Sequence, residues 1–73
     1  MNRAMLKDHL AKAERHVSEG ERLIARQYEM IRTLANDGHS TADAESLLRA
    51  FLDTQALHLA DRDRIQAELA EAI

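Results

Sequence analysis

Two histidines stand where a helix could present each of them beside a carboxylate. His16 is followed three residues later by Glu19, and His58 is followed three residues later by Asp61. Side chains three residues apart share a helix face, and imidazole with carboxylate is a donor set that zinc, iron and manganese accept. The sequence therefore contains a candidate metal or small-ligand site at His16 and His58.

Two features of the same pattern weigh against a metal. The di-metal signature of helical bundles is Glu-x-x-His with additional glutamates, and the order here is reversed. Glu19 and Asp61 also project away from the centre of the apolar surface. Without cysteine the chain has neither thiolate ligands nor disulfides. We therefore expect no cofactor, and metal or small-ligand binding remains the alternative function.

A polar layer is predicted midway along the apolar surface. Its members are polar or small residues on or beside that surface, namely His16, Gly20, Gln55, His58 and Arg62, with Gln27 close by. Because buried polar groups are costly unless they are hydrogen-bonded, such a gathering predicts a hydrogen-bonded network. A network of this kind fixes the register and the oligomeric state of a helical bundle.

One short stretch, residues 36–41, is the only place where the sequence clearly stops being helical. Gly38 can adopt the left-handed conformation that closes a helix C-terminus. Ser40 or Thr41 can accept a hydrogen bond from the first N–H groups of a following helix. If Ser40 is the cap, Asp43 falls at the third helical position, as in a relative of the capping box. The chain therefore divides into two helices at this turn.

Both helices carry more apolar surface than one contact can cover. The first has a heptad seam formed by Leu6, Leu10, Ala13, Val17, Gly20, Ile24, Gln27, Ile31 and Leu34. A second line runs beside this seam through His9, His16, Leu23 and Met30. The second helix has two adjacent lines, one of Leu47, Phe51, His58, Ile65 and Leu69, the other of Leu48, Leu52, Leu59 and Ile73. Two lines can satisfy two neighbours, and only one neighbour is available within the chain.

The predicted fold class is therefore all-α, a two-helix antiparallel hairpin. We expect a single domain over residues 1–73, with a helix over 2–36, a turn over 37–40 and a helix over 41–72. Because a chain of 73 residues buries little surface alone, we expect two copies to form a four-helix bundle. A larger assembly, or a different protein as the other half, is the further possibility.

The turn also predicts a register between the two helices. Antiparallel folding about it pairs residues whose numbers add to about 78. The pairs are Gly20 with His58, Ile24 with Gln55, Ala13 with Ile65, and Leu10 with Leu69. We interpret Gly20 as making room for the imidazole of His58. The guanidinium of Arg62 needs a carboxylate, for which Glu14 and Glu21 are the candidates, in the same chain or in the partner.

Composition argues against several classes of function. The net charge is −3, with +1 on residues 1–37 and −4 on residues 38–73. Nucleic-acid binding needs a basic face and stacking aromatics, and the chain has only Tyr28 and Phe51. A bilayer span needs roughly 20 apolar residues, which no stretch offers, and Lys7 and Asp8 interrupt any signal-peptide core. We expect no nucleic-acid partner, no membrane partner and a cytoplasmic location.

Catalysis finds no support in the residues. There is no cysteine nucleophile, no Gly-rich phosphate loop and no Ser–His pattern with a third group. Four histidines in 73 residues leave pH sensing by a buried neutral imidazole as a third interpretation of the polar layer. The predicted function is a non-enzymatic oligomerisation or protein-interaction module, with a second copy of the chain as its partner.

Parts of both halves resemble a group of short bacterial proteins of unassigned function. The second half does so through the run Gly38-His39-Ser40-Thr41 and the segment Thr54-Gln55-Ala56-Leu57-His58. The first half is similar in the segment Ala13-Glu14-Arg15-His16-Val17. The resemblance implies a helical hairpin, but no activity, cofactor or functional residue.

Overall fold

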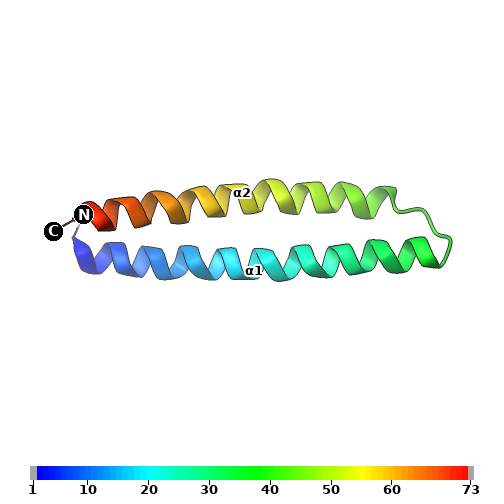
Figure 1. The fold of residues 1–73 in the computed structure, drawn as a ribbon, viewed down its shortest axis with the longest axis horizontal. Coiled ribbons are helices and arrows are strands. Elements are labelled where there is room, and N and C mark those ends of the chain that lie inside the picture. The colour runs from blue at the N-terminus through cyan, green and yellow to red at the C-terminus, as the bar shows by residue number, and fades with distance from the viewer. Residues whose placement is uncertain (1, 73) are drawn as a thin grey trace.

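The described part of the chain, residues 2–72, is a rod made of two long antiparallel helices. In the computed structural model these are α1 (Arg3–Asn36) and α2 (Ala42–Glu71), which lie side by side along most of their length (Figure 1). The Cα atoms span 57 × 14 × 13 Å. The predicted all-α hairpin is confirmed, and its helix bounds differ from the expected ones by one residue at three of the four ends. Neither helix of the described residues is both long enough and apolar enough to cross a bilayer.

The two chain ends are tied together by polar contacts. Asn2 caps α1, its Oδ1 accepting a hydrogen bond of 2.8 Å from the backbone N–H of Met5. Arg3 donates through Nη1 to the carbonyls of Leu69 and Ala72, at 3.2 and 2.8 Å. Carbonyls at a helix C-terminus lack intrahelical partners and attract cations. Arg3 therefore stabilises the last turn of α2 from the first turn of α1.

The turn reverses the chain immediately after α1. Gly38 has φ +76°, in the left-handed region that favours glycine. The N–H of Gly38 donates to the carbonyl of Ala35 at 3.1 Å, and the N–H of His39 donates to that of Leu34 at 2.9 Å. These two bonds make a Schellman motif. The predicted role of Gly38 is confirmed.

Replacing Gly38 by alanine is expected to lower the free energy of unfolding by about 1 kcal/mol, because an L side chain is strained at this φ. The added methyl group has no neighbour within 4 Å, so no steric clash adds to the loss of stability. Urea unfolding followed by far-UV circular dichroism measures the effect. Gly38→Asn is the control, since asparagine tolerates this conformation better and should lose less. Equal stability of the alanine variant and the native chain would contradict the prediction.

The start of α2 differs from the predicted cap. Thr41 is the N-cap residue and makes no side-chain capping bond, while Ser40 Oγ accepts a long bond of 3.4 Å from the N–H of Ala42. Asp43 therefore falls at the second helical position, and the capping-box prediction is wrong. Asp43 and Glu45 still place negative charge in the first turn of α2, where the helix dipole favours it.

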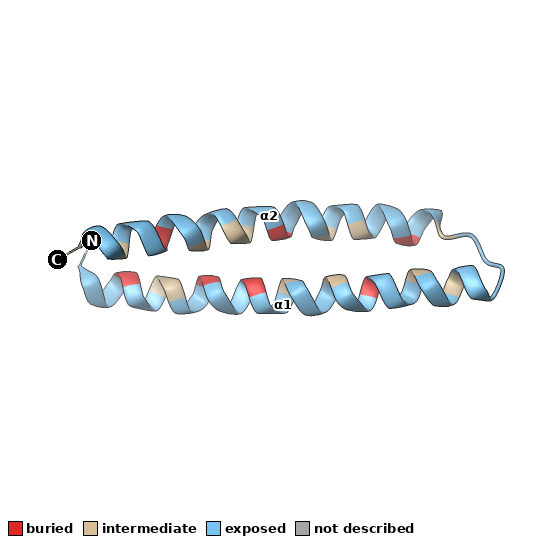
Figure 2. Ribbon diagram, in the orientation of Figure 1, coloured by how far each residue is buried: buried red, intermediate tan, exposed pale blue. Residues whose placement is uncertain are grey.

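The core is a narrow seam on the facing sides of the two helices (Figure 2). Every residue of the heptad seam predicted for α1 is buried or half-buried, which confirms that seam. Near the chain ends Leu6, Ala13 and Ile65 form a cluster, against which Leu10 and Leu69 pack. The predicted neighbours Ala13 and Ile65 thus lie in one cluster.

On α2 the seam divides the predicted lines differently. The residues at its alternating three- and four-residue steps are Thr41, Ala44, Leu48, Phe51, Gln55, His58, Arg62, Ile65, Leu69 and Ala72, all buried or half-buried. Leu47 and Leu52, which the sequence assigned to the two lines, are exposed. Gln55, His58 and Arg62, which were predicted for the polar layer, thus lie on the inner surface of α2, and part of its leucine content faces outward.

The register differs from the predicted one by about one helical turn. His58 was expected opposite Gly20. It lies instead beside His16, four residues before Gly20 on α1, with ring centroids 5.1 Å apart. Gly20 instead faces Gln55, for which Ile24 was the expected neighbour. The reason is the asymmetry of the connection, because α1 reaches beyond the start of α2 and the chain runs back along the rod before α2 begins (Figure 1).

Candidate functional site

Two buried glutamines clamp the helices together. Gln27 of α1 donates through Nε2 to the carbonyl of Ala44 at 2.8 Å, and Gln55 of α2 donates through Nε2 to the carbonyl of Val17 at 2.9 Å. Each bond joins a side chain of one helix to the backbone of the other, where the carbonyl oxygen has a second lone pair available. A slip of either helix along the other would break both bonds. These two glutamines therefore fix the register. The network predicted for the polar layer is not formed, because among the described residues neither His16 nor His58 joins these bonds.

Gly20 makes room for Gln55, and the interpretation that it makes room for His58 is wrong. A Cβ at residue 20 would overlap Oε1 of Gln55 and lie 2.6 Å from its Cδ. The amide oxygen thus occupies the space that any side chain at residue 20 would need. Among the described residues this buried oxygen has no hydrogen-bond donor. It remains an unused acceptor in the middle of the hairpin.

Beside Gln55, the two histidines come together at a small cavity of about 80 Å³. The imidazole rings of His16 and His58 are 5.1 Å apart between centroids and inclined by 41°. The cavity is lined by His16, Glu19, Gly20, Leu23, Phe51, Thr54, Gln55 and His58. Four of the five residues predicted for the polar layer therefore line one cavity. The register predicted between the two helices was nevertheless wrong.

The histidines are less buried than the pH-sensing interpretation requires. His16 is exposed and His58 is only half-buried. Arg62, the fifth predicted member, does not line the cavity. Its guanidinium pairs with Asp63, Nη2 to Oδ1 at 2.9 Å, and within the described chain neither Glu14 nor Glu21 pairs with it.

One hairpin supplies only part of a metal-binding set. Residues 2–72 contain no group of three or more histidine or carboxylate side chains that could hold a metal ion. Asp61 is engaged elsewhere, since its Oδ1 lies 2.7 Å from Nη2 of Arg64. Hydrogen bonds to Asp61 and then to Glu68 raise the pKa of Arg64 above its ordinary value. The metal-ligating groups left at the cavity are the two imidazoles and the carboxylate of Glu19.

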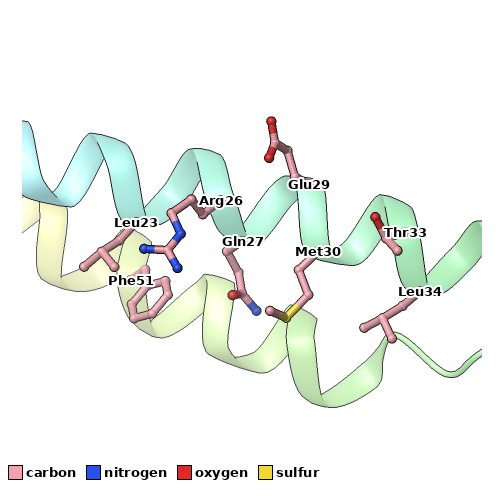
Figure 3. A pocket seen from close by; sticks show the side chains of 8 residues that line it. All are labelled: Leu23, Arg26, Gln27, Glu29, Met30, Thr33, Leu34 and Phe51. Atoms are coloured by element: carbon pink, nitrogen blue, oxygen red, sulfur yellow. The ribbon is translucent and has the colours of Figure 1, made fainter.

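An open groove continues from the cavity toward the turn, lined by four apolar residues (Leu23, Met30, Leu34, Phe51) and four polar ones (Arg26, Gln27, Glu29, Thr33). It encloses about 560 Å³ and shares Leu23 and Phe51 with the cavity. Figure 3 shows Leu23 beside Phe51 at one end, Leu34 at the other and Met30 between them. Leu23 is 44 % and Met30 54 % exposed, so this line of the predicted α1 surface is left uncovered by α2.

We call this side of the rod the groove face. On α2 it continues through the positions of Leu47 and Thr54, which are seven residues apart and share a helix side; Thr54 lines the cavity. Toward the chain ends the same side holds a second, polar hollow between His9, Lys12 and Asp61. The groove face therefore carries Leu23 and Met30 together with Arg26 and Glu29 near the turn, and Lys12 and Asp61 near the termini, with the histidine pair between the two halves.

Known proteins give no indication of the function of this chain. The chain matches no protein-family model, no curated protein and no solved structure. The resemblance to short bacterial proteins stays a prediction.

Proposed function

We propose that the hairpin is a non-enzymatic oligomerisation module, in which a second copy of the chain covers the groove face and completes a four-helix bundle. The observation that carries the proposal is the line of large apolar side chains left in water: Leu23, Met30 and Leu47 are 44, 54 and 46 % exposed. A contiguous apolar surface of this kind marks an interaction site on a small protein. Two packed helices are also too few to cover their own apolar lines.

Surface area supports a second copy as the occupant. A compact monomer of 8.3 kDa exposes about 4,600 Å² by the usual scaling with mass, whereas the hairpin exposes 5398 Å². The excess of about 800 Å² follows from the rod shape. An interface of standard size needs about 800 Å² from each partner, so the rod has enough surface for one. A two-fold dimer buries the same surface of both chains, so one apolar groove per chain is sufficient.

Charge substitutions on the groove face should therefore dissociate the protein. Replacing both Leu23 and Met30 by glutamate places two carboxylates in the interface, where unpaired charge is strongly disfavoured. We expect the native chain to sediment as a dimer at micromolar concentration, and the double variant as a monomer with reduced helicity. Sedimentation equilibrium with circular dichroism of the same samples measures both.

The matched control is Tyr28→Glu, because Tyr28 is 51 % exposed and lies two residues before Met30 and five after Leu23, on the other side of α1. This variant should remain a dimer. A native chain that sediments at 8.3 kDa with unchanged helicity over a wide concentration range would refute the proposal. Capture of a different protein by the same face would assign the groove to a heteromeric partner and would equally refute self-association.

A further inference from the structure

We infer that His16 and His58 form half of a transition-metal site, and that two hairpins hold one divalent ion between their groove faces. The inference rests on the proposed dimer and names a ligand for it. One chain offers two imidazoles, and a structural zinc site has four protein ligands. The site is therefore incomplete without the second copy.

The spacing of the imidazoles is the first support. Two histidines on one tetrahedral ion have metal–nitrogen bonds of about 2.0 Å, which places their ring centres about 5 Å apart. The centroids of His16 and His58 are 5.1 Å apart and the rings are tilted by 41°, so they are not stacked face to face. Two side chains of different helices thus have the separation that a shared ion requires.

The surroundings of the rings are the second support. Among the described residues neither imidazole takes part in a hydrogen bond or an ion pair, since every side-chain bond near them involves other groups. Gln55 lines the same cavity, is 7 % exposed and keeps Oε1 without a donor. Histidines that bind metals donate their other N–H to an acceptor of this type. Glu19, on the same cavity, supplies negative charge beside the ion.

We take the two chains to run in the same direction, with both turns at the same end of the dimer. Leu23 and Met30 of one chain then cover the same residues of the partner. The opposite direction would bury Lys12 and Asp61 against leucine, at the cost of desolvating charges. The charges of the terminal half balance, with Lys12 and Arg64 against Asp61 and Glu68, so like ends can meet.

In the same-end arrangement, residues at one level of the rod meet each other across the two-fold axis. The histidine pair of one chain then faces the histidine pair of the other, and four imidazoles surround one point. Nitrogen ligands suit zinc, cobalt, nickel and copper, whereas magnesium and calcium require oxygen. The ligand is therefore a divalent transition metal, for which Zn²⁺ and Co²⁺ are the probes.

Titration of the chelator-treated chain with Zn²⁺ in a calorimeter tests the inference. We expect one ion for every two chains, and absorption bands of tetrahedral cobalt when Co²⁺ replaces zinc. His16→Ala should weaken binding by more than the roughly 10- to 100-fold that the loss of an outer-shell partner costs, and its exposed position leaves folding intact. His58→Gln is the second variant, with circular dichroism to verify its helicity.

His39→Ala is the matched control, because His39 lies in the turn and should not change zinc binding. Zinc binding that survives His16→Ala, or one ion per chain, would identify an adventitious surface site and overturn the inference. Sedimentation with chelator separates the two proposals. A metal-free dimer that takes up no zinc overturns the metal site alone, whereas a chain that stays monomeric with and without zinc overturns both.

Discussion

Replacing Gly20 by alanine is expected to destabilise the hairpin by about 1–3 kcal/mol, the usual cost of overfilling a packed core. At an ordinary helix position the same change would stabilise by about 1 kcal/mol, so the sign of the effect is the test. The reason is Gln55, whose Oε1 and Cδ occupy the space that the new methyl group needs. To make room, the amide of the buried Gln55 must shift, which strains its bond to the carbonyl of Val17. Urea unfolding at one fixed chain concentration measures the change.

The double variant Gly20→Ala, Gln55→Ala isolates the contact. With Gln55 truncated, the alanine at residue 20 no longer meets an amide, and its effect should turn stabilising by up to about 1 kcal/mol. In the matched double-mutant cycle, Gly20→Ala is introduced together with His58→Ala. Gly20→Ala should remain destabilising in that background. If instead the His58 truncation rescued Gly20→Ala and the Gln55 truncation did not, the register described above would be wrong.

Replacing Ile65 by alanine is expected to lower the free energy of unfolding by about 2–4 kcal/mol, through lost burial and the cavity left behind. Ile65 is 4 % exposed and packs with Leu6 and Ala13 in the cluster near the chain ends. A domain of this size has a total stability of roughly 4–11 kcal/mol. The variant therefore loses a large share of its stability, visible as a lower urea midpoint.

The control for Ile65→Ala is Leu57→Ala on the same helix. Leu57 is 72 % exposed, so its truncation should change stability by no more than about 0.5 kcal/mol. Similar losses in the two variants would contradict the packing described here. They would mean that the buried seam contributes no more to stability than the solvent-facing side of α2.

The two buried glutamines link stability to assembly. Each uses one amide hydrogen bond to hold the backbone of the opposite helix, and Gly20 provides the space that one of them needs. Because the helices are fixed in this register, His16 and His58 come to the same level and the apolar groove opens beside them. The residues that determine the fold thus also place the surface on which the proposed function depends.

The sequence by itself determined the elements of this protein and the inner face of α1. Alternation of three- and four-residue steps from Leu6 to Leu34 is a local property of a helix, and the structure buries that seam. Gly38 marks the turn because only the left-handed conformation closes α1 by a Schellman motif. Both features depend on neighbours within a few residues, which a sequence displays directly.

Only the tertiary structure decided the register and, with it, the composition of the candidate site. A shift of about one turn is set by the path of residues 39–41 between the helices, which no periodicity encodes. That shift exchanges His58 for Gln55 opposite Gly20 and brings His58 to His16. The structure also shows which leucines of α2 the other helix leaves uncovered, since Leu47 and Leu52 are exposed. Contacts between helices depend on where one helix begins relative to the other, and that position is a property of the folded chain.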